Sequence, residues 1–160
     1  MKLKKYGCYI LLIALLLYIP PSNMLQAQDY HVVFKEKISD NLYCITDITE
    51  TPLPKVNYFS STKTKHGSKT LRYENSAGET LWTLELRATF SYTGTSSTCT
   101  NASVSSTVPS SNWSITNKRS WTSGSTGYAS ATIKHSVSSV IVDSFSRTIS
   151  LTCSNNGSLQ

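Results

Sequence analysis

Between Leu81 and Tyr92 the chain alternates strictly between apolar and polar residues. The polar positions carry Thr, Glu, Arg and Ser side chains. The apolar and aromatic positions are Trp82, Leu84, Leu86, Ala88, Phe90 and Tyr92. A period of two puts one set on one face of a β-strand and the other set in water. The pattern therefore predicts a strand over residues 81–92 with one buried face.

Similar but weaker alternation recurs along the chain, separated by residues that favour turns. The further strands predicted in this way lie at 70–74, 102–108, 113–115, 128–137 and 145–153. Glycines in the segments 75–78 and 123–127 suit hairpin turns. No segment has a convincing amphipathic helical pattern. Short strands separated by turns predict an all-β fold, an antiparallel immunoglobulin-like β-sandwich of about seven strands.

The N-terminus has the layout of a secretory signal peptide. Three lysines precede an apolar run at residues 9–19, which Pro20 and Pro21 close. The pattern predicts cleavage after Ala27 and a secreted, extracellular protein. A membrane-spanning helix needs about 20 apolar residues, so we expect no stable span after cleavage. A retained membrane anchor is the alternative.

The chain after the leader changes composition near residue 66. We expect a signal peptide at 1–27, an N-terminal extension at 28–66 and a β-sandwich domain at 67–160. The extension is mixed in composition and is interrupted by prolines. It contains two candidate short strands, at 31–36 and 41–46.

The charge balance and the motifs exclude several classes of function. The chain has 15 basic and 9 acidic residues. Three of the basic residues lie in the leader, which leaves 12 against 9, a net charge of +3. Basic residues are not clustered as a nucleic-acid-binding face requires, so we expect no nucleic-acid partner. Phosphate-binding, zinc-binding and nucleophile-elbow motifs are absent from the sequence, and we expect no cofactor and no metal.

Three cysteines remain after the leader, Cys44, Cys99 and Cys153. In an oxidising compartment two of them should pair. Cys99 and Cys153 are the favoured pair because both belong to the Ser/Thr-rich strand region. Closing a loop of about 54 residues would stabilise the fold by about 4 kcal/mol. Cys44 would then be a buried free thiol.

Two aromatic residues are the main candidates for binding. Trp121 and Tyr128 flank the Gly/Ser loop, and Lys118 and Arg119 lie nearby in the sequence. Such a pair could stack on a sugar ring or anchor a protein partner. The alternative is that both rings pack on the edge of the sandwich. We favour a non-catalytic module that binds an extracellular surface, glycan or protein partner.

A small secreted hydrolase is the alternative function. It would use Asp143 or Glu85 with His135. His135 shares its strand parity with Ile133, so a half-buried histidine in the core is the simpler interpretation. Nothing in the sequence places the two carboxylates together, as a glycosidase requires. Proximity of these side chains in one pocket would support the hydrolase.

Segments 81–84, 90–94 and 148–157 are arranged with a particular spacing around Cys99 and Trp113. Over about residues 69–159 this spacing resembles that of a group of small secreted proteins from Gram-positive bacteria, which carry a C-terminal β domain. The resemblance implies secretion, a β-sandwich and paired cysteines. It carries no active-site residues.

Overall fold

A computed structural model of the chain describes residues 31–51 and 61–160. These residues form eight strands and no helix. The strands are β1 (His31–Ser39), β2 (Leu42–Thr51), β3 (Lys63–Asn75), β4 (Thr80–Tyr92), β5 (Ser97–Thr107), β6 (Trp113–Ser123), β7 (Thr126–Val137) and β8 (Val140–Thr152). The predicted signal peptide at 1–27 lies outside the described residues.

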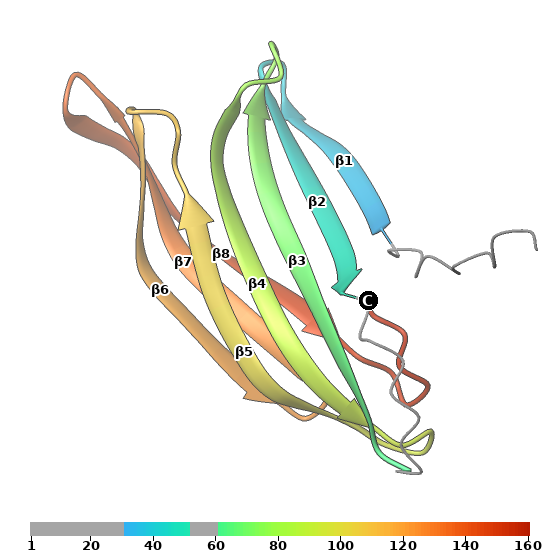
Figure 1. Cartoon of the computed structure of the whole chain (residues 1–160). Coiled ribbons are helices and arrows are strands. Elements are labelled where there is room, and N and C mark those ends of the chain that lie inside the picture. Colours follow the sequence, from blue (N-terminus) through green and yellow to red (C-terminus); the bar gives the residue numbers. More distant parts are fainter. Residues whose placement is uncertain (1–30, 52–60) are drawn as a thin grey trace, which may run out of the picture.

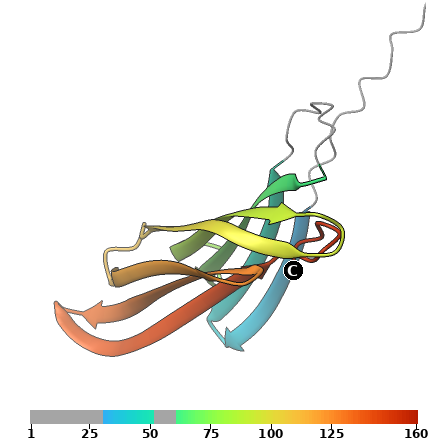
Figure 2. The same ribbon diagram turned by 90° about the horizontal axis from the view of Figure 1, so that it is seen from below.

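The strands form two antiparallel sheets, which Figures 1 and 2 show as separate layers. Sheet A has the order β1-β2-β3-β4-β5, and sheet B has the order β6-β7-β8. The prediction of an all-β antiparallel sandwich is confirmed. Within each sheet the strands pair in the order of the sequence, so each sheet is a meander. The described strands therefore lack the Greek-key connections that are usual in immunoglobulin domains.

The predicted alternation in residues 81–92 forms the centre of the core. The side chains of Trp82, Leu84, Leu86 and Phe90 are fully buried on the inner face of β4. Tyr73 of β3 stacks on Trp82, with the ring centroids 4.2 Å apart. The prediction for this strand is confirmed.

Sheet B covers the core from the other side. Its buried inner positions are Ala129, Ala131, Ile133, Ile149 and Leu151. β8 lies against β3 and β4, whereas β1 and β2 extend beyond it. The sandwich is therefore open along its edge strand β1, where Phe34 and Ile38 are exposed, whereas Cys44 and Ile48 of β2 are buried.

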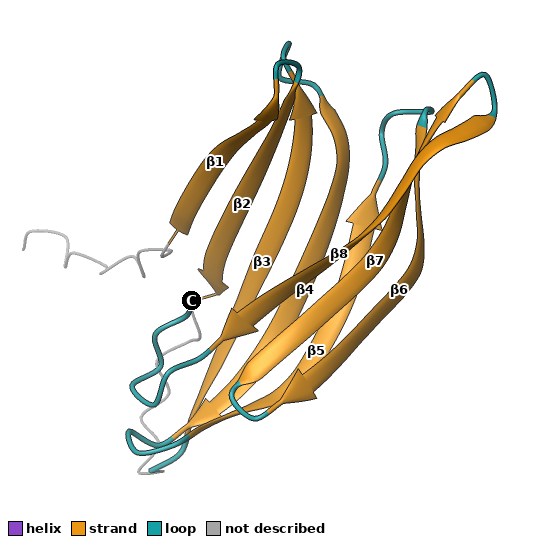
Figure 3. Cartoon of the chain, turned by 180° about the vertical axis from the view of Figure 1, so that it is seen from behind, coloured by secondary structure: helices purple, strands orange, loops and turns teal. Residues whose placement is uncertain are grey.

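The end of β7 departs from the predicted parity. The register shifts between His135 and Ser136. His135 is half-buried and stacks on Trp113, with centroids 4.5 Å apart. Val137 lies beyond this shift and is half exposed. The β7–β8 hairpin projects past the neighbouring strands, as Figure 3 shows, so its tip has no opposite sheet to pack on.

The segment predicted as an N-terminal extension supplies two strands of sheet A. The two short strands expected at 31–36 and 41–46 are parts of the longer β1 and β2. β2 pairs with β3 along its whole length. Cys44 and Ile48 of β2 are buried in the same core as Tyr73. Residues 31–51 thus contribute to the core.

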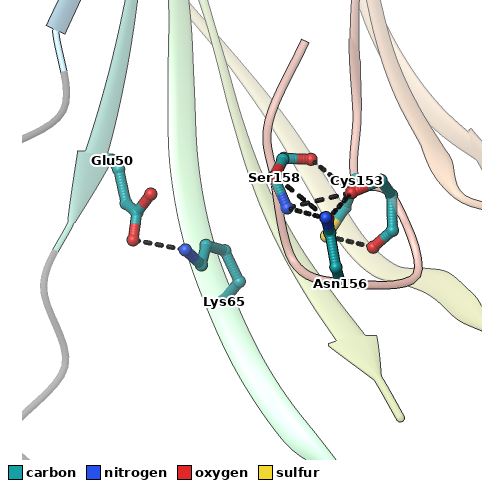
Figure 4. A network of polar contacts seen from close by, with 6 residues as sticks. Glu50, Lys65, Cys153, Asn156 and Ser158 are labelled. Carbon is teal, nitrogen blue, oxygen red and sulfur yellow. Dashed lines mark hydrogen bonds and ion pairs between the residues drawn. The ribbon is translucent and has the colours of Figure 1, made fainter. Parts of the chain in front are cut away.

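Polar side chains fix the ends of the strands. Between β3 and β4, the Asn75 side-chain oxygen accepts the backbone N–H groups of Ala77 and Glu79, and Gly78 has a φ of +82°. Near the start of β3, Lys65 forms an ion pair with Glu50 of β2 (Figure 4).

The chain ends in a compact polar turn that follows Cys153 (Figure 4). The Ser158 backbone N–H donates to the Ser154 hydroxyl at 3.0 Å and to the Asn156 side-chain oxygen at 3.1 Å. The next residue, Leu159, is buried, and a Cβ on Gly67 would collide with it. The turn therefore holds an apolar residue over the end of the core.

Candidate functional site

The predicted aromatic pair lies on the outer face of sheet B. Trp121 of β6 and Tyr128 of β7 are register partners. Their rings are stacked, with centroids 5.1 Å apart and planes 5° from parallel. The next register pair, Ser120 and Ala129, points inward, and Ala129 is fully buried. Trp121 is 41% exposed, so the largest side chain of this face is open to solvent.

A bulge in β6 puts Trp121 on that face. Trp113 and Ile115 contact the core, and a regular strand would turn Trp121 inward with them. The register instead moves from Thr116↔Thr132 to Arg119↔Ser130, which inserts one extra residue in β6. Sequence parity alone predicts the wrong face for Trp121. The positive φ of 52° at Asn117, at this shift, is consistent with the asparagine found there.

The two predicted cations lie beside the aromatic pair. The Arg119 Nε donates to the Ser130 hydroxyl at 3.3 Å. Lys118 and Arg119 border a shallow hollow of about 570 Å³ on the outer face. Its other polar side chains are those of Asn117, Ser130, Thr132, Ser146 and Thr148. The structure therefore brings all four predicted binding residues to one face, Trp121 and Tyr128 with Lys118 and Arg119.

The residues of the hydrolase alternative divide between the sheets. Glu85 lies on the outer face of sheet A, where it accepts Arg87 Nε at 2.8 Å and the Ser105 hydroxyl at 2.9 Å. His135 belongs to the inner face of sheet B. The core lies between them, so the structure does not bring Glu85 to His135. Asp143 is the register partner of His135 on β8, but no hydrogen bond or ion pair joins the two side chains.

Cys99 and Cys153 are both buried and are free thiols in the structure. Their backbones meet at the β6–β7 turn. The Cys99 N–H donates to the Gly124 carbonyl at 2.7 Å, and the Cys153 N–H donates to the Ser125 carbonyl at 3.0 Å. Burial is the main cause that raises the pKa of the Cys99 thiol, and the neighbouring Cys153 raises this pKa further.

Cys44 is a third buried free thiol, on the inner face of β2. Burial raises the pKa of its thiol, and the charge of Glu36 on β1 adds to the rise. A raised pKa keeps the thiol protonated and weakens it as a nucleophile.

Sequence reasoning missed one exposed surface, the tip of the β7–β8 hairpin. Ser138 and Ser139 form its turn with positive φ angles of 50° and 67°. The aliphatic side chains around the turn are more than half exposed; they are Val137, Val140, Ile141 and Val142. The sequence did contain a signal for this surface, the three consecutive aliphatic residues at 140–142. Neighbouring residues of a strand point to opposite faces, so an unbroken aliphatic run must expose at least one of its side chains when only one face is buried.

Within residues 31–51 and 61–160, no group of three or more His, Cys, Asp or Glu side chains is arranged to hold a metal ion. The same part of the chain contains no helix long and apolar enough to cross a membrane. No known protein family, curated protein or solved structure matches the chain.

Proposed function

We propose that this protein is a secreted, non-catalytic β-sandwich module that binds a glycan through the outer face of β6, β7 and β8. The exposed stack of Trp121 on Tyr128 is the observation that carries the proposal. A small domain usually needs its large aromatic side chains for its core. A tryptophan that a bulge turns outward, onto a polar face, is better explained by a ligand.

The surroundings of the pair favour a sugar over a protein partner. Beside the rings the outer face carries Ser and Thr hydroxyls rather than apolar side chains. Protein interfaces have a core that is depleted in serine and enriched in apolar groups. A sugar ring offers an apolar face for stacking and hydroxyls that pair with Ser and Thr. The flat aromatic and hydroxyl surface suits such a ligand.

Secretion and a disulfide belong to the same proposal. The leader at residues 1–27 supports export, and an oxidising compartment would allow thiols to pair. The backbone N–H groups of Cys99 and Cys153 donate hydrogen bonds to adjacent residues of one turn, which supports these two cysteines as the disulfide pair. Their bond would tie the start of β5 to the chain just after β8.

The binding test uses the protein from residue 28 onward, immobilised glycans and the variants Trp121→Ala and Tyr128→Ala. We expect each variant to lose at least about tenfold in affinity, because loss of a central aromatic contact costs more than about 1.4 kcal/mol. Phe34→Ala is the matched control, since Phe34 is an exposed aromatic residue on β1 of the other sheet. Its affinity should not change. Unchanged binding by folded Trp121→Ala would refute the site.

The hydrolase alternative is now restricted to His135 with Asp143, because these two are register partners. Hydrolysis of a glycan or ester substrate by the wild type, lost in both His135→Ala and Asp143→Asn, would favour it. Activity that survives either substitution in a folded variant would exclude this pair.

A further inference from the structure

We infer that the ligand of this face is an anionic polymer, a glycan or glycan-like chain that carries carboxylate, sulfate or phosphate groups. This inference rests on the proposed function, because it names the ligand class of the same site. The evidence for it is the positive charge on the outer face of sheet B, for which stacking on the aromatic pair would give no reason.

The outer face of sheet B carries cations without carboxylate partners. Arg119 and Lys134 lie on its outward positions, and Lys118, in the bulge of β6, borders the hollow on the same face. None of them forms an ion pair within the described part of the chain. By contrast, all the ion pairs found there lie in residues 31–87 and join basic side chains of sheet A to Asp or Glu, although Lys63 and Lys69 of β3 form none. Sheet B leaves its positive charge uncompensated.

No acidic side chain of sheet B faces that surface. Asp143 is the only Asp or Glu in strands β6, β7 and β8. It pairs in register with His135, and the next inward pair on the same face is Ile133 with Phe145. Asp143 therefore lies at an inward-facing position of β8, on the opposite side of the sheet from the outer face. An approaching anion meets three positive groups and no carboxylate of these strands.

The cations and the rings are spaced to act on one extended ligand. Arg119 and Trp121 are two residues apart on the same side of β6, which is about 7 Å along a strand. Ser130 is buried and holds the Arg119 Nε, which leaves the terminal amino groups of the guanidinium without a partner among the described residues. Such a planar fork matches the oxygens of a carboxylate, sulfate or phosphate.

These positions give the ligand a direction. A chain lying along β6 would stack a ring on Trp121 and place an acidic group at Arg119. Lys118 and the hollow lined by Ser and Thr hydroxyls would then receive the next unit. An uncharged polymer would use the rings and hydroxyls but would leave the cations unused.

The test compares affinities for a neutral β-glucan, polygalacturonate, heparin and a polyol-phosphate polymer at low and moderate salt. We expect at least one anionic polymer to bind about tenfold tighter than the neutral one, with an advantage that shrinks as salt screens the charges. The three anionic arms identify whether carboxylate, sulfate or phosphate is preferred.

The double variant Lys118→Gln/Arg119→Gln should lose about tenfold in affinity for the anionic polymer and little for the neutral one. Lys35→Gln/Lys37→Gln on β1 removes the same charge elsewhere and is the control, with an expected change below about twofold. Thermal melting verifies that each variant is folded.

Two outcomes separate this inference from the proposed function. Equal affinity for neutral and anionic polymers, with no effect of the Lys118 and Arg119 substitutions, would overturn the anionic ligand. Glycan binding would then still depend on Trp121. Absence of binding to every polymer would overturn both.

Discussion

The three tryptophans of the chain occupy three different environments. Trp82 is fully buried against Tyr73, and Trp113 is half-buried beside His135. Trp121 is exposed on the outer face of sheet B. The same residue type thus serves the core in one strand and, in our proposal, a ligand in another.

This difference predicts that two matched substitutions destabilise the protein to different extents. Trp82→Ala should lower the free energy of unfolding by about 3–5 kcal/mol, because it opens a cavity in the core. Trp121→Ala should lower it by less than about 1 kcal/mol, since surface substitutions away from the core usually have small effects. Urea unfolding measures both. A large destabilisation by Trp121→Ala would mean that this ring is a structural element rather than a binding group.

The bulge in β6 depends on the backbone of Asn117. Its φ of +52° lies in the left-handed region, where a β-branched residue is strained. Asn117→Val should therefore destabilise the protein by about 1–2 kcal/mol, whereas Asn117→Gly should be nearly neutral. Ser114→Val, at a regular position of the same strand, is the control. Equal stabilities of the two valine variants would argue against a strained residue at this position.

At the level of the elements, the β6–β7 turn links the start of β5, with Cys99, to the chain after β8, with Cys153. Gly127 follows this turn, and a Cβ there would lie 3.1 Å from the Ala88 Cβ and 3.2 Å from the Cys99 Sγ. The two sheets therefore approach each other closely at this end. A disulfide would hold together a contact that packing already makes.

The raised pKa values of Cys44 and Cys99 predict how the stability of the reduced protein depends on pH. The native state holds these thiol protons more tightly than the unfolded chain does, so unfolding releases protons above the ordinary thiol pKa of 9.0. Stability is then fully present below pH 9 and falls as the pH rises above it. Urea unfolding of reduced protein between pH 7 and 10.5 measures the effect.

A disulfide removes one of these two thiols from the titration. Oxidised protein should lose less stability than reduced protein over the same pH range, because Cys99 no longer ionises. Cys44→Ser is the control for the remaining thiol. Identical pH profiles of oxidised and reduced protein would contradict the assignment of Cys99 to the pair.

Across the whole molecule, the alternation of apolar and polar residues predicted the strands that have an apolar face. It did not predict the full length of the polar strands or which strands pair with one another. The period of two over residues 81–92 predicted β4 and its buried side because each inward position is large and apolar. Strands β5 and β6 were predicted too short, since Ser and Thr fill much of their length and give no apolar signal. β1 and β2 were assigned to an extension because their composition differs, although pairing with β3 makes them part of sheet A.

The candidate site was predictable in its residues but not in its geometry. Proximity to a Gly/Ser loop was enough to select Trp121, Tyr128, Lys118 and Arg119. The face on which they lie depends on one extra residue in β6, and periodicity cannot show such a register shift. The absence of carboxylates from the outer face likewise became visible only when the parity of Asp143 was known.

The most direct test of the proposed binding face is an NMR titration of the protein from residue 28 onward with an acidic oligosaccharide, which follows the indole N–H signals of the three tryptophans. We expect the Trp121 signal and the amides of β6 and β7 around the outer face to shift, while the signal of buried Trp82 stays in place. Shifts confined to the open edge at β1, or no shift with any saccharide, would contradict glycan binding by this face.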